Sequence, residues 1–372
     1  MIGVFRRRML ALMTLVAKNI YNTAFFAVIL SGCTTVPDIH VISGEAQGTT
    51  FSIKYLGEHK ISKNDVDSLL ELMDVEMNTW RDDSRIVAIN NFSREDTVFT
   101  FYDDSKIWSV LWDLTWEIHH DSRGAFDPTI KPLVDLWGFG LKNVASVDSS
   151  AVDSVMSFIG FRTDIIDMDE VENSTTYLET HFIKGDRRAQ LDFNAIAQGY
   201  TVDMIIDFLL ENKVDNAMVE LGGEVRCMGV NQNEEFWRIA VDKPLEHSDA
   251  ANRDFQAILN VNNTAVCTSG NYRKFHLVDG IKRSHTIDPR TGYPVEHSLL
   301  SVTIQAPDAA TADAYATACM VLGPHEGREF VERMREESYG SPIEALFIMT
   351  SSEAEEFDFW VSPGWSDSIY WL

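Results

Sequence analysis

Apolar residues recur along the chain with two spacings, one typical of helices and one typical of strands. A spacing of three or four residues predicts helices from Ser62, near 104–119, from about Ala195 and over 309–321. Alternation and short apolar runs predict strands at 49–55, 217–221, 236–242, 257–267, 299–306 and 344–350. Helices and strands mix without strict alternation, so we expect an α+β fold in one compact domain over residues 44–372.

The first 32 residues have the pattern of a secretory signal peptide. Three arginines at positions 6–8 precede apolar runs that end at Leu30-Ser31-Gly32-Cys33. A Cys in this setting resembles the lipobox of bacterial lipoproteins, which implies cleavage before Cys33 and diacylation of that residue. Residues 33–43 would then be the lipidated Cys and a tether. An uncleaved membrane anchor is the alternative, but Lys18-Asn19 leave an apolar run shorter than the ~20 residues that a spanning helix needs.

The charge of the chain argues against nucleic acid as a partner. The formal net charge is −26, and removal of residues 1–32, which carry four basic side chains, lowers it to −30. Binding to nucleic acid requires a basic surface. An anionic ligand would therefore need a metal ion or backbone N–H groups to offset the acidic field.

The remaining cysteines show no pattern of a disulfide framework or a zinc site. Cys227, Cys267 and Cys319 are three in number and form no CxxC pair. We interpret them as small apolar residues of the core.

The stretch ADAYAT places two oxygen-bearing side chains in an Ala-rich segment. Asp313 and Thr317 are four residues apart, so both lie on one face of the predicted helix. Carboxylate and hydroxyl oxygens suit Mg²⁺ or Ca²⁺. Taken alone, the stretch also fits a packed helix in which Thr317 bonds its own backbone and Asp313 faces solvent.

Other segments have the residue types of a binding site, although common nucleotide and hydrolase motifs are absent. The sequence contains no phosphate-binding loop, dinucleotide fingerprint, nucleophile elbow or zinc-protease motif. Trp80 fits either a core position or a platform for a flat ring. Asp192 fits a helix cap or a helix-start ligand site. His285, close to Asp288 in sequence, fits a general base or a structural histidine.

Six segments, taken in order, resemble one protein family. They are SRGAFDPTIKPLVDLWGFG, LDFNAIAQGYTVD, VELGGEVR, TSGNYR, SHTIDPRTG and TADAYATACMVLG. Over about residues 44–350 the chain is similar to the bacterial FAD:protein FMN transferases, the ApbE lipoprotein family. The resemblance implies an α+β, T-fold-like enzyme that binds FAD and splits its pyrophosphate with Mg²⁺. FMN then passes to a Ser or Thr hydroxyl of a protein as a phosphoester, and AMP is released.

The resemblance also implies roles for individual residues. Metal ligands would be Asp313, Thr317 and the backbone carbonyl of Ala195, with Ala316 where some members have an acidic residue. His285 would be the base for the acceptor hydroxyl, and Asp313 would be catalytic through the metal. Positions that match FAD contacts are Gln47, Trp80, Ala125, Phe126, Asp127, Asp192, Gln198 and Ile287. Among these, Gln47, Trp80 and Gln198 depart from the more frequent Met, Tyr, and Lys or Glu.

Two other functions remain open at this level. One is a Mg²⁺-dependent FAD pyrophosphatase that gives FMN and AMP, and the other is a non-catalytic flavin-binding lipoprotein. The family resemblance implies acceptors in membrane respiratory complexes, such as subunits of the sodium-pumping quinone reductase or of Rnf-type complexes. We expect the protein at the periplasmic face of the bacterial inner membrane, anchored by lipid at Cys33.

Overall fold

The chain folds as one compact unit over Pro37–Leu372. The computed structural model describes residues 38–93, 98–140, 144–172, 178–245, 254–272, 275–278, 281–338, 340, 342–353, 356–365 and 369–372. Cys33 and the expected signal peptide lie outside the described residues. Among the described residues, no helix is both long enough and apolar enough to cross a membrane.

The centre of the fold is an eight-stranded sheet in which every pair of neighbouring strands is antiparallel. In spatial order the strands are β1 (Ile39–Ala46), β2 (Thr49–Leu56), β6 (Asn216–Leu221), β7 (Glu224–Met228), β10 (Thr264–Gly270), β15 (Leu299–Ala306), β16 (Glu344–Thr350) and β17 (Phe357–Val361). The α+β class is confirmed. The tether expected over 33–43 is wrong for its second half, because Ile39 already pairs with Leu56 in the β1–β2 hairpin.

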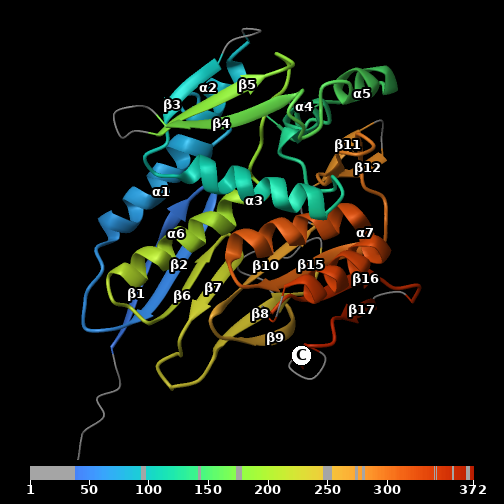
Figure 1. Ribbon diagram of the computed structural model, residues 1–372. Coiled ribbons are helices and arrows are strands. Elements are labelled where there is room, and N and C mark those ends of the chain that lie inside the picture. The colour runs from blue at the N-terminus through green and yellow to red at the C-terminus, as the bar shows by residue number, and fades with distance from the viewer. Residues whose placement is uncertain are drawn as a thin grey trace, which may run out of the picture. The chain divides into compact units, whose positions relative to one another are not determined.

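Two helices cover one face of this sheet and pack against each other. They are α6 (Ala197–Glu211) and α7 (Ala309–Glu337), and α7 lies over β10 and β15 (Figure 1). Helix α1 (Lys63–Met77) packs on α6, and α3 (Ile107–Asp121) contacts α7. The core between these layers is apolar, and it includes Ile53, Val202, Val219, Ile304 and Phe347, none of which is exposed. Burial of these surfaces is the main force that holds α6 and α7 in place.

Smaller elements surround this central layer. Two three-stranded sheets are β3 (Val98–Tyr102), β5 (Leu178–Lys184) and β4 (Ile166–Glu172), and β18 (Tyr370–Trp371), β9 (Phe255–Val261) and β8 (Trp237–Asp242). Two hairpins are β11 (Phe275–Val278) with β12 (Ile281–Ser284), and β13 (Ile287–Asp288) with β14 (Tyr293–Pro294). The remaining helices are α2 (Arg85–Asn91), η1 (Pro128–Ile130), α4 (Lys131–Leu136) and α5 (Ser149–Met156).

Two element boundaries differ from the sequence-based prediction. The single strand expected over 257–267 is two strands, β9 and β10, joined by a tight turn in which Asn263 has φ 52°. A left-handed residue cannot continue a strand, and Asn tolerates that conformation. Helix α7 continues beyond 321 because the chain turns at Gly323 (φ 76°) and restarts a helix at Pro324.

The three described cysteines are buried and free, as predicted. Burial raises the pKa of each thiol above its usual range. They act as small core residues.

Candidate active site

The site is built where the start of α6 meets the first turns of α7. The backbone N–H of Gly199, in the first turn of α6, donates to Oδ2 of Asp313 across 3.2 Å. First-turn amides have no partner within their own helix, so a carboxylate from another helix satisfies this one. A Cβ atom at position 199 would lie 2.3 Å from the carbonyl oxygen of Ala309. Only glycine therefore allows the two backbones to approach this closely.

Asp313 is a buried carboxylate without a cationic partner among the residues that the structure describes. Burial raises its pKa to about 7, the Gly199 amide opposes that rise, and the charge of Asp203 adds to it. A buried carboxylate is costly unless a cation or several donors compensate it. The expectation that Asp313 faces solvent in a purely structural helix therefore does not hold. The Asp313 carboxylate is therefore a candidate ligand for a small, hard cation.

Thr317 lies one turn after Asp313 on the same helix face, and its hydroxyl forms a hydrogen bond with another side chain. Its Oγ1 lies 3.3 Å from Oγ of Ser269, near the end of β10. Ala195, whose carbonyl is the third expected ligand, precedes the first residue of α6 by two positions. Ser269 is not among the ligands that the family resemblance implies. The segment TSG offered its hydroxyl as a candidate, but the place of that hydroxyl beside α7 depends on the tertiary packing of β10.

Two of the six segments and helix α2 meet at the turn before α6. The N–H of Asp192 donates to the carbonyl of Pro128 across 2.7 Å. The side chain of Asn90, in α2, bonds both the N–H and the C=O of Leu191 at 2.7 and 2.8 Å. The carboxylate of Asp192 accepts from Asn194 N at 2.8 Å, and burial raises its pKa. This turn is thus fixed from two sides.

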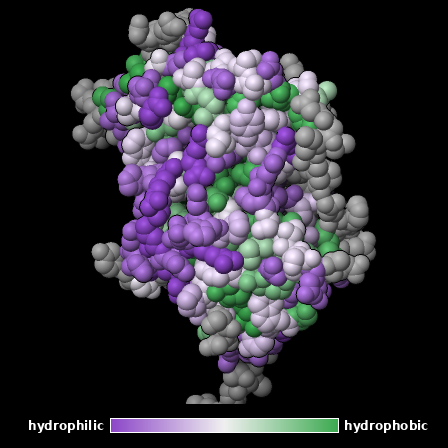
Figure 2. Space-filling view, turned by 90° about the vertical axis from the view of Figure 1, so that its right-hand side faces the viewer, coloured by the Kyte–Doolittle hydropathy of each residue, from purple (hydrophilic) through white to green (hydrophobic). Residues whose placement is uncertain are grey.

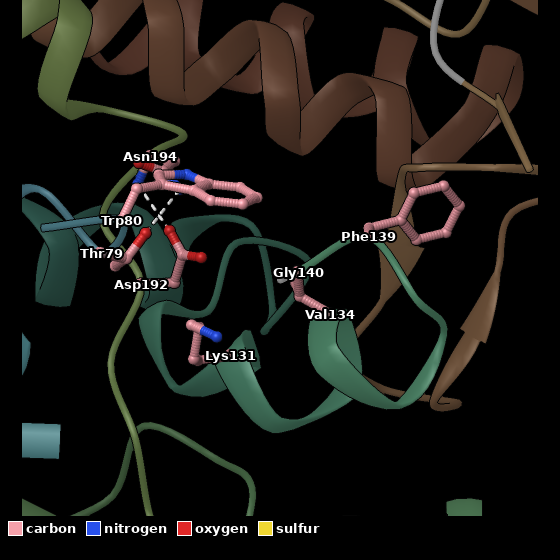
Figure 3. Close-up of a pocket in the computed structure, with 8 residues that line it drawn as sticks. All are labelled: Thr79, Trp80, Lys131, Val134, Phe139, Gly140, Asp192 and Asn194. Carbon is pink, nitrogen blue, oxygen red and sulfur yellow. Dashed lines mark hydrogen bonds between the residues drawn. The ribbon is translucent and has the colours of Figure 1, made fainter. Parts of the chain in front are cut away.

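A small pocket opens beside this turn (Figure 3). Its volume is about 40 Å³, and it is lined by Thr79, Trp80, Lys131, Val134, Phe139, Gly140, Asp192 and Asn194. Trp80 lies beyond the end of α1 and is 58% exposed, so the core interpretation of this residue is wrong. A large exposed indole beside a polar pocket offers a face on which a flat ring can stack.

Asp127, Ala125 and Phe126 belong to a buried loop that is bonded within the protein. One carboxylate oxygen of Asp127 accepts from the N–H and hydroxyl of Thr129, at 2.7 and 2.6 Å, and the other from Phe161 N at 3.1 Å. The carbonyl of Phe126 bonds Nδ1 of His119 at 2.8 Å. The Asp127 side chain therefore shapes this loop, and any ligand contact by its carboxylate would be shared with these donors.

Gln47 packs against the first turns of α6, and Gln198 is itself a first-turn residue of that helix. Gln47 sits in the β1–β2 turn with φ 49°, and its Nε2 donates to the Thr201 hydroxyl at 2.9 Å. The side chain of Gln198 lies beside Gly222, which has φ 68° in the turn between β6 and β7. Gln47 thus reaches the start of α6 from the β1–β2 turn, whereas Gln198 belongs to the first turn of α6 and lies beside the β6–β7 turn.

His285 contacts one residue of the pocket lining, and Ile287 is packed in a core cluster nearby in the chain. The His285 ring lies edge-on to Phe139, a pocket residue, with 6.4 Å between ring centroids. Ile287 is buried beside Leu133 and Trp137, so its side chain is part of a small core cluster. Asp288 forms an ion pair with Arg290 at 2.9 Å, which commits this carboxylate to that guanidinium.

A larger hollow elsewhere does not contain the predicted residues. It has a volume of about 820 Å³ and is lined by Lys243, Leu245, Asp254, Gln256, Thr350, Ser351, Glu353, Glu356, Phe357 and Phe359. In the side view of Figure 2, hydrophobic residues gather in the lower half of the surface and hydrophilic residues predominate to the left. The candidate site is the region around the start of α6 and the first turns of α7, because the β1–β2 turn, the β6–β7 turn and the end of β10 meet these helices there.

Known proteins resemble this chain over nearly its whole length. The ApbE family model matches residues 47–339. FAD:protein FMN transferases of Vibrio cholerae and Haemophilus influenzae are 32% and 29% identical to it; each alignment covers 82% of this chain and 87% of the relative. The solved flavin transferase ApbE of Vibrio cholerae superposes with a TM-score of 0.72 at 28% identity, over 90% of this chain and all of that one. The apo form of the Pseudomonas stutzeri flavinyl transferase ApbE gives 0.74 at 28% identity, over 89% and 97%. The chain belongs to the ApbE family and, like these relatives, is an enzyme.

Proposed function

We propose that this protein transfers FMN from FAD to a Ser or Thr hydroxyl of an acceptor protein and releases AMP. The names of the curated relatives support a FAD:protein FMN transferase. The observation that carries the mechanism is the buried carboxylate of Asp313, which lies at the start of α6 without a cationic partner among the described residues. A pyrophosphate substrate bears charge that this acidic protein must compensate locally.

The residues around Asp313 fit Mg²⁺. Asp313, Thr317 and the carbonyl of Ala195 would hold it, and Ala316 leaves one position for water or a phosphate oxygen. When bound, Mg²⁺ would neutralise charge on the non-bridging oxygens of the pyrophosphate. The rigid α6–α7 contact keeps the carboxylate oriented before substrate arrives, which lowers the cost of reorganisation.

FAD would lie between this site and the Trp80 pocket. The exposed Trp80 indole supports stacking of the flavin ring at the mouth of the pocket. The first turn of α6, which includes Gln198, would offer its backbone amides to the phosphates. Gln47 and Asp192 border the same region from β1–β2 and from the turn before α6.

His285 would accept the proton of the acceptor hydroxyl. The acceptor oxygen then bonds to the FMN phosphorus, the P–O bond to AMP breaks, and AMP leaves with the electron pair. A hydroxyl is a poor nucleophile without a base, and histidine is the side chain most often used for such proton transfer. The placement of His285 beside Phe139 supports this role.

We further propose a lipid anchor at Cys33 and action at the periplasmic face of the inner membrane. The sequence before Cys33 supports this location. The acceptors would be subunits of membrane respiratory flavoproteins, such as the sodium-pumping quinone reductase or Rnf-type complexes.

One experiment tests the activity. Residues 34–372 are incubated with FAD, Mg²⁺ and an acceptor domain that carries the target Thr, and both in-gel flavin fluorescence and AMP are measured. Fluorescent acceptor together with AMP is the expected result. AMP without labelled acceptor would show hydrolysis of FAD instead. If FAD binds and neither product forms, the protein is a flavin-binding lipoprotein without activity.

A further inference from the structure

Asp203 joins the two helices of the site at a second point. It lies on α6 one turn after Gly199 and is buried. Its Oδ1 accepts from the N–H of Ala309 at 2.9 Å, and its Oδ2 accepts from the N–H of Ala310 at 2.8 Å. Both donors are first-turn amides of α7, which have no partner within their own helix. Asp203 thus caps α7 from a neighbouring helix.

This contact is not required simply to cap α7. The residue before the helix, Asp308, already accepts from the N–H of Thr311 at 2.8 Å through its own side chain. That is the usual way in which a helix start is satisfied. What Asp203 adds is a connection between α7 and a different element.

The two connections between the helices have matching spacing. On α6, Gly199 and Asp203 are four residues apart, and on α7, Ala309 and Asp313 are four residues apart. Gly199, the earlier residue of α6, bonds Asp313, the later residue of α7. Asp203, the later residue of α6, bonds Ala309, the earlier residue of α7. These two connections, which comprise three hydrogen bonds one helical turn apart, restrict both the sliding and the rotation of α7 relative to α6.

A third element holds Asp203 itself. Nη1 of Arg226, in β7, donates to its Oδ1 at 2.7 Å, and this ion pair is largely buried. The guanidinium stabilises the carboxylate in the form that accepts from both amides. Asp203 therefore connects the start of α7 both to α6 and, through Arg226, to the central sheet.

We propose that Asp203 is a positioning residue. It holds α7 so that Asp313 lies at the distance from Ala195 and from strand β10 that cation binding requires. This inference rests on the proposed Mg²⁺ dependence. Without the Asp203 bonds, Gly199–Asp313 is the one hydrogen bond between α6 and α7 among the residues that the structure describes. Helix α7 can then shift relative to α6. Cation affinity should then fall while the fold persists, as is typical when a residue that orients a metal ligand is removed.

The test compares two substitutions at the start of α7 in the full chain. Asp203→Asn keeps the shape but offers one acceptor oxygen instead of two, and it loses the charge that pairs with Arg226. Asp308→Ala removes the ordinary cap of the same helix and serves as the matched control. The readouts are the Mg²⁺ concentration that gives half-maximal AMP release from FAD, and the rise in Tm with Mg²⁺ in the presence of ADP, a pyrophosphate without flavin.

The expected result is a rise of about tenfold or more in half-saturating Mg²⁺ for Asp203→Asn in both readouts, and less than about twofold for Asp308→Ala. Equal shifts in the two variants, or none in Asp203→Asn, would overturn the proposal. If Asp203→Asn does not fold, Arg226→Gln replaces it; a smaller rise in half-saturating Mg²⁺ is expected there, and an unchanged value would overturn the proposal. If the wild type itself shows no Mg²⁺ dependence in either readout, the proposed function fails first.

Discussion

The amide of Gly199 donates to Oδ2 of Asp313 across 3.2 Å, which joins two helices that are more than 100 residues apart in the chain. The bond uses an N–H that the helix α6 leaves free and a carboxylate that α7 buries. It places the proposed cation ligand at the positive end of a helix dipole, where a negative charge is stabilised.

Gly199→Ala should separate the helices. A Cβ would lie 2.3 Å from the Ala309 carbonyl oxygen, and backbone cannot move aside as a flexible side chain can. We expect a loss of about 1–3 kcal/mol in unfolding free energy, together with a fall in AMP release. Urea unfolding and an AMP assay measure these effects. Gly57→Ala, where the nearest atom would be 4.0 Å away, is the control and should change stability little. Equal effects of the two substitutions would contradict the prediction.

Asp313→Asn should abolish Mg²⁺-dependent activity without loss of stability. The amide oxygen can still accept from Gly199, while the buried negative charge, whose pKa burial raises to about 7, is removed. At pH 8 we expect the Tm to be equal to or higher than that of the wild type. Differential scanning calorimetry and AMP release test this. Asp207→Asn, on the exposed face of α6, is the control for the change of net charge. A variant at position 313 that keeps full Mg²⁺-dependent activity would refute the ligand assignment.

Trp80→Ala should weaken FAD binding and leave the fold intact. The indole is 58% exposed, so its removal costs little core packing. Loss of one aromatic stacking partner should raise the KM for FAD by roughly 2- to 13-fold, since such contacts contribute about 0.5–1.5 kcal/mol. Steady-state kinetics measure the KM for FAD, and a Tm measurement shows whether the fold is intact. Trp116→Ala, at another exposed tryptophan on α3, should leave this KM unchanged.

The buried amine of Lys184 should make stability depend on pH above neutrality. Its Nζ donates to the carbonyl of Asn90 at 2.9 Å, and burial lowers its pKa to about 8 from 10.5. Between pH 8 and pH 10.5 the unfolded chain binds more protons at this group than the folded one does. The contribution of Lys184 to the free energy of unfolding therefore increases as the pH rises over this range, and the increase is lost as the pH falls through 8.

Lys184→Met isolates this contribution, because other titrating groups are common to both proteins. The difference in unfolding free energy between wild type and Lys184→Met should move in favour of the wild type from pH 8 to pH 10. The slope should not exceed about 1.4 kcal/mol per pH unit. Urea unfolding at pH 7.5, 9 and 10 measures it, and a constant difference would show that Lys184 titrates normally in the fold.

The sequence by itself determined the local elements and the family. Apolar spacing predicted a helix from Ser62, which the structure shows to be the N-cap of α1, and it predicted strands β15 and β16 at their observed bounds. These features depend on neighbouring residues only, because the faces of a helix or strand repeat over a few positions. The order of the six family segments was likewise present in the sequence, and it indicated the family without knowledge of any tertiary contact.

Only the tertiary structure decided how these segments are used. It exposed Trp80, which spacing had left between core and ligand platform, and it turned Asp127 inward to bond Thr129 and Phe161. It also paired Asp203 with the first amides of α7 and brought Ser269 beside Thr317. Each of these contacts joins residues whose relative position is set by the packing of helices on a sheet. Hydrophobic burial, which acts over the whole chain, fixes that packing, and so no local pattern of residues can specify it.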